Sequence, residues 1–232
     1  MPGSAGGIAA VLLAAGGGSR LGCSKLLLPW RGRPLIAHLL RTVAVGGESL
    51  LSLTVVLGHE AEAVRKAVEG CPAPPFPLHF AVNHAWCEGQ SGSLRCGLQS
   101  LLAGLSQESP PASQIQGALF LLADQPLIKP ETLQRLIDAH RSACSANPAH
   151  PATVPLYGGR RGNPVIISPR LFPARLELRG DSGARKILQE LDGELLRVTV
   201  DDPGILQDVD TPEAYAGLLA MDGGGPDPGT AR

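Results

Sequence analysis

The stretch IAAVLLA at residues 8–14 is wholly apolar and runs through Ala15 into three consecutive glycines at residues 16–18. A short apolar run without alternating polar side chains is typical of a β-strand that is buried on both faces of its sheet. Glycines directly after such a strand permit a tight turn with exposed backbone N–H groups. The stretch therefore predicts a central strand followed by a glycine loop.

Apolar runs of similar length recur along the chain. They cover residues 53–57, 78–82, 117–122, 165–167 and 195–200, and most are separated by segments with helical spacing. Strands that alternate with helices in this way predict an α/β domain with a largely parallel sheet.

Three of the helical segments have recognisable beginnings. Two of them follow a proline, Pro34 or Pro130, which suits the first turn of a helix, and their apolar residues repeat at helical spacing. The third is the last predicted helix, which Thr211 is placed to cap and which we expect to run to about Ala220.

Length and composition predict a single domain. The chain has 232 residues, of which 44% are hydrophobic, and this is enough to form one full core. We expect that domain over residues 8–220, between a flexible N-terminus at residues 1–7 and a disordered tail at residues 221–232. Prolines and polar residues predict irregular loops at residues 71–77 and 106–116.

Charge and hydropathy restrict the class of partner. A formal net charge of −1 provides no broad cationic field, which argues against nucleic acid as the main partner. The apolar run at residues 8–15 is too short to span a membrane, and no basic segment of a secretion signal precedes it. Five cysteines without a CxxC pair favour reduced thiols. We therefore expect a cytoplasmic protein that binds neither membranes nor nucleic acid.

Two basic residues, Arg20 and Lys25, lie within or just after the glycine loop. Exposed backbone N–H groups and nearby cationic side chains together favour the binding of phosphate oxygens. The loop matches neither the P-loop pattern nor the dinucleotide-binding pattern. A flexible turn is the alternative interpretation, and the two basic residues favour a cradle for a triphosphate.

Three aspartates are candidate metal ligands. Asp124 directly follows an apolar run, which places it at the carboxyl end of a predicted central strand, where open α/β sheets bind ligands. Asp208 and Asp210 form a second acidic cluster just before the last predicted helix. Carboxylates in such positions can hold the hard cation that phosphate chemistry requires. For Asp208 and Asp210, capping of that helix is the alternative role.

Several other polar segments allow a purely structural role. Ser91 and Ser93 lie just before a predicted helix and are suited to cap it. The segment GGRRGNP at residues 158–164 is typical of a β-turn or hairpin with surface arginines. Asp181 and Arg185 are spaced as a surface ion pair. We interpret three histidines that lie in or beside apolar patterns as structural: His38, His59 and His140.

The order of these segments resembles that of one family. Residues 13–29 (LAAGGGSRLGCSKLLLP), 122–126 (LADQP) and 208–213 (DVDTPE) are similar to the signature loop and metal-binding motifs of MobA-like NTP transferases. The molybdenum cofactor cytidylyltransferase group is the most similar. Over about residues 8–220, the resemblance implies a three-layer α/β/α Rossmann-like nucleotidyltransferase fold with a mostly parallel sheet.

The resemblance also implies functional roles. Catalysis would depend on Arg20, Lys25 and Asp124, and Mg²⁺ would bind Asp124 together with Asp210 or Asp208, a choice that remains open. The acceptor would lie near Asn163, Asp181 and Arg185. The nucleotide would contact the loop and two serines: Leu13, Ala14, Ala15, Gly16, Gly17, Gly18, Ser19, Arg20, Lys25, Ser91 and Ser93.

The pair Ala14-Ala15 is similar to that of the cytidylyl members, whereas guanylyl members usually have Ala-Gly. The resemblance therefore implies transfer of CMP from CTP to a molybdopterin-type cofactor, with release of pyrophosphate, for delivery to a molybdenum hydroxylase. One alternative is a sugar phosphate or another small phosphate as acceptor. Another is a non-catalytic protein that binds and delivers the cofactor, or a redox-adapted relative.

Overall fold

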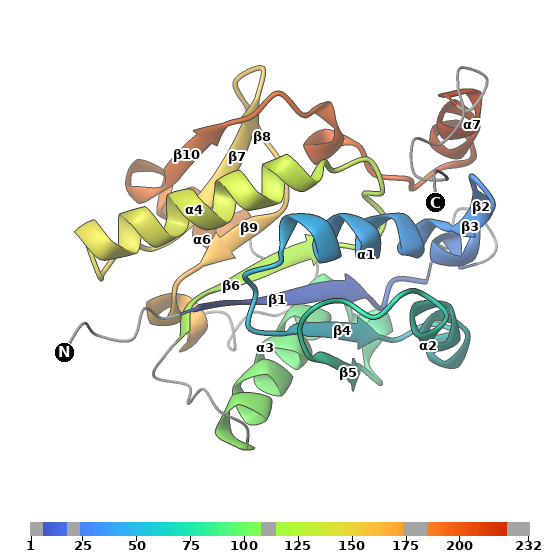
Figure 1. The fold of residues 1–232 in the computed structure, drawn as a ribbon, viewed down its shortest axis with the longest axis horizontal. Coiled ribbons are helices and arrows are strands. Elements are labelled where there is room, and N and C mark those ends of the chain that lie inside the picture. Colours follow the sequence, from blue (N-terminus) through green and yellow to red (C-terminus); the bar gives the residue numbers. More distant parts are fainter. Residues whose placement is uncertain (1–6, 18–23, 108–114, 174–184, 222–232) are drawn as a thin grey trace.

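An eight-stranded sheet forms the centre of the computed structural model, which describes residues 7–17, 24–107, 115–173 and 185–221 (Figure 1). The strand order is β10-β7-β9-β6-β1-β4-β5, and β8 pairs with β7. The strands are β1 (Gly7–Ala14), β4 (Leu53–Leu57), β5 (Leu78–Val82), β6 (Ile115–Leu122), β7 (Ala152–Tyr157), β8 (Arg160–Arg161), β9 (Val165–Ile167) and β10 (Leu196–Thr199). A separate small sheet pairs β2 (Pro29–Trp30) with β3 (Arg33–Pro34).

Most of the neighbouring strands in the main sheet run parallel. The central strand β1 pairs in parallel with β4 and β6, and the same direction holds for β4 with β5 and for β7 with β10. The antiparallel pairs all involve the short strands β8 and β9. The expected α/β fold with a mostly parallel sheet is confirmed.

Helices cover both faces of the sheet and give three layers (Figure 1). On one face lie α1 (Leu35–Gly46), α2 (Ala61–Glu69) and α4 (Pro130–Ala146), and their apolar residues share one core cluster. On the other face lie α3 (Gln90–Gln107) and α6 (Arg185–Glu190), in a second cluster. The last helix, α7 (Pro212–Ala220), lies beside the small β2–β3 sheet (Figure 1). No helix in these described parts of the chain is both long and apolar enough to cross a membrane.

The central strand explains why its sequence shows no polar alternation. Ile8 and Leu12 belong to the core cluster under α1 and α4, whereas Ala9 and Val11 belong to the cluster under α3. Because both faces of β1 are covered, every position must be apolar. The helix α3 approaches very closely, since a Cβ atom at Gly97 would lie 2.4 Å from Cγ1 of Val11.

The sequence patterns predicted most elements but not all of them. The strands at residues 53–57, 78–82 and 165–167 have the predicted bounds, and α7 begins after Thr211, whose hydroxyl accepts a bond from the Ala214 amide. The predicted loop at 106–116 is too long at both ends, because α3 extends to Gln107 and β6 begins at Ile115. The apolar runs did not predict the strand β7, and β8 was expected only as part of a possible hairpin at residues 158–164. Apart from Gly7, which begins β1, and Met221, the expected flexible N-terminus and the expected tail lie outside the described residues.

A buried histidine links α4 to the sheet. His140 is fully buried, and its ring nitrogens lie 2.9 Å from the Thr153 hydroxyl and 3.2 Å from the Gln116 carbonyl. Burial lowers the pKa of His140 to about 4, and the neighbouring His150 adds to this effect. The side chain is therefore neutral in the folded protein at neutral pH, as its structural interpretation requires.

We expect this histidine to make the fold sensitive to acid. The unfolded chain binds a proton at this histidine near pH 6.5, but the folded protein does so only near pH 4. The free energy of unfolding is therefore highest above pH 6.5 and decreases as the pH falls from 6.5 toward 4. The shift corresponds to about 3 kcal/mol of unfolding free energy. Urea unfolding between pH 4 and 8 measures it. His140→Gln should flatten the pH dependence, whereas the control His84→Gln, at an exposed position, should not. An equal slope in His140→Gln and wild type would contradict the assignment.

Candidate functional site

The candidate site lies at the carboxyl ends of the two central strands. Asp124 follows β6, and the amide of Ala123 donates to the Leu13 carbonyl at the end of β1 (3.1 Å). The segment that carries the other two aspartates is held beside it, because the Val209 amide donates to the Asp124 carbonyl (2.9 Å). The chain thus brings the two acidic segments together, as ligand sites in open α/β sheets require.

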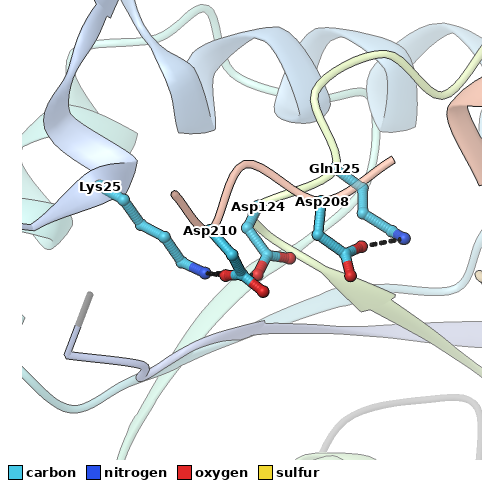
Figure 2. A network of polar contacts seen from close by, with 5 residues as sticks. All are labelled: Lys25, Asp124, Gln125, Asp208 and Asp210. Atoms are coloured by element: carbon cyan, nitrogen blue, oxygen red, sulfur yellow. Dashed lines mark hydrogen bonds and ion pairs between the residues drawn. The ribbon is translucent and has the colours of Figure 1, made fainter. Parts of the chain in front are cut away.

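An acidic cluster surrounds the amine of Lys25, which begins the short helix η1 (Lys25–Leu27). Lys25 Nζ donates to Asp124 Oδ2 at 2.6 Å and also bonds to Asp210 Oδ1. Figure 2 shows the lysine reaching toward these two carboxylates, with Asp208 on the far side of Asp124 in this view. Only 11% of the Lys25 side chain and 19% of the Asp124 side chain are exposed, whereas 45% of the Asp210 side chain is, so the pair with Asp124 is the more buried of the two.

Burial and charge act in opposite directions on these groups. Burial alone would lower the pKa of Lys25, but Asp124 and Asp210 together raise it above its ordinary value. Burial raises the pKa of the Asp124 carboxyl, and the two neighbouring aspartates add to that rise, while Lys25 opposes it. Lys25 therefore remains charged, and Asp124 needs a cation beside it to stay ionised at low cost.

Gln125 holds the third aspartate in place. Its side chain is buried, and Nε2 donates to Asp208 Oδ1 at 2.6 Å and to the Ile205 carbonyl at 3.4 Å (Figure 2). Gln125 belongs to the motif LADQP, but no role for it was predicted from the sequence. The alternative prediction that Asp208 and Asp210 cap the last helix is wrong, because the residue that caps α7 is Thr211.

The donor set fits a hard cation in its chemistry but not in its present arrangement. Asp124 Oδ1 is buried and has no hydrogen-bond partner among the described residues, so an oxygen ligand is available there. However, no group of three His, Cys, Asp or Glu side chains in the described ranges is arranged to hold a metal ion. In this arrangement Lys25 and Gln125 bond to the three carboxylates. The amine neutralises Asp124 and Asp210, and the amide bonds to Asp208.

Two cavities meet at Asp124. The first has a volume of about 340 Å³ and is bordered by the start of the glycine loop, by Lys25 and by the first turn of α3. The second has a volume of about 410 Å³ and extends toward β8 and β9. Both are lined by Leu13, Gln90, Leu122 and Asp124. The site is therefore divided into two chambers with a carboxylate at their junction.

The first cavity contains part of the predicted nucleotide-binding set. Six members of that set line the cavity: Leu13, Ala15, Gly16, Gly17, Lys25 and Ser93. Ala14, the last residue of β1, is instead buried in the core cluster under α1 and α4. Gly18, Ser19 and Arg20 lie outside the described residues. Ser91 and Ser93 lie inside α3 rather than before it, so the capping role is wrong. Ser93 instead accepts a bond from Asn83 (3.0 Å), and Ser91 is fully buried with no partner for its hydroxyl in the described part of the chain.

An aromatic wall of the first cavity was not predicted. Trp86 lines the cavity and packs against the ring of His59 at 4.9 Å. Its ring also lies against Gly17, where a Cβ atom would come within 2.8 Å of it. Only 3% of the chain is aromatic. This scarcity was the one signal in the sequence that could have drawn attention to Trp86, which lies just before Ser91 and Ser93.

The second cavity is lined by three residues of the GGRRGNP segment, among them Gly162, and by all three aspartates. Asn163 and Arg161 line it together with Asp124, Asp208 and Asp210. The predicted hairpin exists, but only Arg160 is an exposed surface arginine. Of the other predicted acceptor residues, Asp181 and the side chain of Arg185 lie outside the described part of the chain.

Comparison with known proteins places this arrangement in a family. The sequence model of the MobA-like NTP transferase domain matches residues 10–195. Nicotine blue oxidoreductase of Paenarthrobacter nicotinovorans is 33% identical over 216 residues, which cover 91% of this chain and 96% of that protein. Purine catabolism protein PucB of Bacillus subtilis is 31% identical over 214 residues, which cover 88% and 92%.

Solved structures agree with the sequence matches. Rv0371c from Mycobacterium tuberculosis is similar with a TM-score of 0.73 and 28% identity, over 94% of this chain and 99% of that chain. A complex of the same protein with manganese has a TM-score of 0.67 and 27% identity, over 92% and 98%. A divalent metal is therefore plausible for this fold. Because the family match covers most of the sequence, this chain belongs to the MobA-like NTP transferase family of NTP-dependent nucleotidyltransferases.

Proposed function

We propose that this protein transfers CMP from CTP to a molybdopterin-type cofactor and releases pyrophosphate. The observation that carries the proposal is the junction of two cavities at Asp124, with Lys25 on the side of the glycine loop. A transferase of this kind needs one chamber for the triphosphate and one for the acceptor. The Ala14-Ala15 pair supports cytosine as the base, and the family supports the pterin as acceptor.

The reaction needs no covalent enzyme intermediate. An oxygen of the acceptor phosphate attacks the α-phosphorus of CTP, and the bond from that phosphorus to the bridging oxygen breaks, so pyrophosphate leaves with the bonding electrons. Lys25 and Arg20 would stabilise the charge that spreads over the phosphates. Asp124, with Asp210 or Asp208, would hold Mg²⁺, which when bound neutralises phosphate charge. Catalysis then consists of positioning and electrostatic stabilisation.

The acceptor cavity contributes Asn163, whose position is fixed by the backbone. The Asn163 amide donates to the Ile205 carbonyl at 3.0 Å, and the chain from Ile205 continues to the two aspartates before α7. An asparagine can donate and accept hydrogen bonds but cannot act as a proton-transfer base. We therefore assign Asn163 to acceptor binding, along with Asp181 and Arg185 on the basis of the family resemblance.

A matrix of substrates tests the proposal. Purified protein with Mg²⁺ is incubated with CTP, GTP, UTP or ATP, each combined with molybdopterin or with glucose 1-phosphate. Pyrophosphate release and mass spectrometry of the product are measured. We expect the highest kcat/KM for CTP with molybdopterin. Product formed only with the sugar phosphate would contradict the pterin acceptor, and a preference for GTP would contradict the base assignment.

One relative favours a second candidate. The name of the Paenarthrobacter protein describes an oxidoreductase, and its similarity extends over 91% of this chain. A redox activity would be detected as reduction of an added redox dye by an added electron donor, and we expect none. Dye reduction without pyrophosphate release in any mixture would favour the redox candidate. Tight molybdopterin binding without either activity would favour a delivery protein for a molybdenum hydroxylase.

A further inference from the structure

A tight hairpin determines which of two adjacent arginines faces the site. The strand β8 pairs antiparallel with β7, with Tyr157 opposite Arg160 and Leu156 opposite Arg161. The turn between them consists of Gly158 and Gly159, whose φ angles of +54° and +76° suit a two-residue hairpin loop. Neighbouring residues of a strand point to opposite faces. Arg160 is accordingly exposed, and Arg161 is half-buried and lines the second cavity.

Among the residues that the structure describes, Arg161 has almost no hydrogen-bond partner. Its single contact there is a bond from Nη1 to the Leu188 carbonyl at 3.5 Å, which is long. No described residue forms an ion pair with it, although three carboxylates line the same cavity. By contrast, Arg170 and Arg197 lie 2.6 Å from their carboxylate partners on the surface. A guanidinium carries several N–H donors, so most of the hydrogen-bonding capacity of Arg161 is left for a ligand.

The charge of the second cavity also requires such a cation. Asp124, Asp208 and Asp210 all line it and the single amine of Lys25 offsets only part of their charge, while among the described lining residues Arg161 is the only lysine or arginine. A guanidinium binds a phosphate through two parallel hydrogen bonds, which fix the orientation of the phosphate as well as its position. Apolar side chains complete the wall beside it and suit the body of a phosphate ester: Leu94, Phe120, Val165 and Leu188.

The base of the hairpin is held rigidly against the acidic segment. A Cβ atom at Gly162 would lie 2.3 Å from the Ile205 carbonyl oxygen, so the backbones are in direct contact there. The Gly162 amide also donates to the Pro155 carbonyl of β7 (3.2 Å). Arg161 is therefore fixed relative to the segment that leads to Asp208 and Asp210, rather than carried on a free loop.

We propose that Arg161 binds the phosphate monoester of the acceptor and selects for anionic acceptors. This inference rests on the proposed function, because it assigns the second cavity to the acceptor. The position of Arg161 separates the two substrates. It lines the second cavity and not the first, so its contribution belongs to the acceptor and not to the triphosphate.

Steady-state kinetics with the full chain tests the inference, with Arg160→Gln as the matched control. Arg161→Gln should lower kcat/KM for molybdopterin by about tenfold or more, mainly through KM, because a charge-assisted bond is lost. The KM for CTP should change by less than about twofold. Arg160→Gln should leave both parameters near wild type, and Arg161→Lys should recover part of the loss. Equal effects of the two glutamine variants, or a rise in the KM for CTP as large as that for molybdopterin, would overturn the proposal.

Calorimetry separates this inference from the proposed function. Molybdopterin, and in a second arm glucose 1-phosphate, is titrated into wild type and Arg161→Gln without CTP or metal. Weaker binding of either phosphate ester by the variant supports the role of Arg161 even if wild type transfers no nucleotide. Two outcomes would overturn that role even if CMP transfer is observed. In the first, a phosphate ester binds wild type and the variant equally well. In the second, neither phosphate ester binds wild type. The two arms also show which phosphate ester the cavity accepts.

Discussion

Replacing Asp124 by asparagine is expected to lower kcat for CMP transfer by about a hundredfold or more without destabilising the fold. Asparagine keeps the shape of the side chain but removes the charge that a hard cation requires. The fold should tolerate the change, because burial raises the pKa of this carboxyl and its ionised form is costly inside the protein. Asp210 still accepts a bond from Lys25 in the variant. Kinetics and urea unfolding at pH 7.5 measure the two effects.

A matched aspartate provides the control for Asp124→Asn. Asp138 is exposed on α4, and its carboxylate accepts a bond from the Gln134 side chain (3.0 Å) on the surface of that helix. Asp138→Asn should leave kcat within about twofold of wild type. Normal turnover of Asp124→Asn at saturating Mg²⁺ would contradict a metal-binding role. A fall in stability as large as the fall in activity would instead indicate that Asp124 serves mainly to pair Lys25.

The local sequence was sufficient to predict the framework on which Asp124 lies. The strands at residues 53–57 and 78–82 were predicted with their observed bounds, and β6 ends just before Asp124 as expected. Parallel strands covered on both faces must be apolar throughout, so each of them is visible as a short run. The position of Asp124 then follows, because ligands bind at the carboxyl ends of such strands.

The strand β7 could not be predicted in the same way. Pro155 lies within it, and a proline inside an apolar run argues against a strand. Here the pairing with β9 and β10 holds the segment in place, and these contacts are distant in sequence. Without β7, the hairpin with β8 has no register, and the two arginines of that hairpin cannot be distinguished. That is why the structure was needed to separate Arg161 from Arg160.

The arrangement of the charged cluster also depends on the fold. Lys25 was predicted as a phosphate ligand, but in the structure its amine bonds to two carboxylates that lie 99 and 185 residues further along the chain. Local patterns identify each charged residue and give no distance between them. A role of Lys25 in phosphate binding is compatible with these ion pairs. A phosphate would take the place of the carboxylates at the amine, and a metal cation would take the place of the amine at the carboxylates.

Replacing Lys25 by methionine is expected to remove activity and stability together. Turnover should fall by about a hundredfold or more, because Lys25 is the only lysine or arginine among the described residues that line the first cavity. The variant also leaves Asp124 buried without its counter-charge, which should cost about 3 kcal/mol of unfolding free energy. Kinetics and urea unfolding at pH 7.5 measure the two losses. The control Lys66→Met, at an exposed position on α2, should change neither.

Two further measurements show whether the lost ion cluster causes this instability. In the double variant Lys25→Met/Asp124→Asn, the unpaired charge is gone, so its stability should exceed that of Lys25→Met alone. Mn²⁺ without nucleotide should raise the unfolding midpoint of Lys25→Met more than that of wild type, because the amine no longer neutralises Asp124 and Asp210. Neither the second substitution nor Mn²⁺ should restore turnover, because the triphosphate still lacks the ammonium group of Lys25. Additive losses in the double variant, or equal stabilisation of both proteins by Mn²⁺, would show that Lys25 does not compete with metal for these carboxylates.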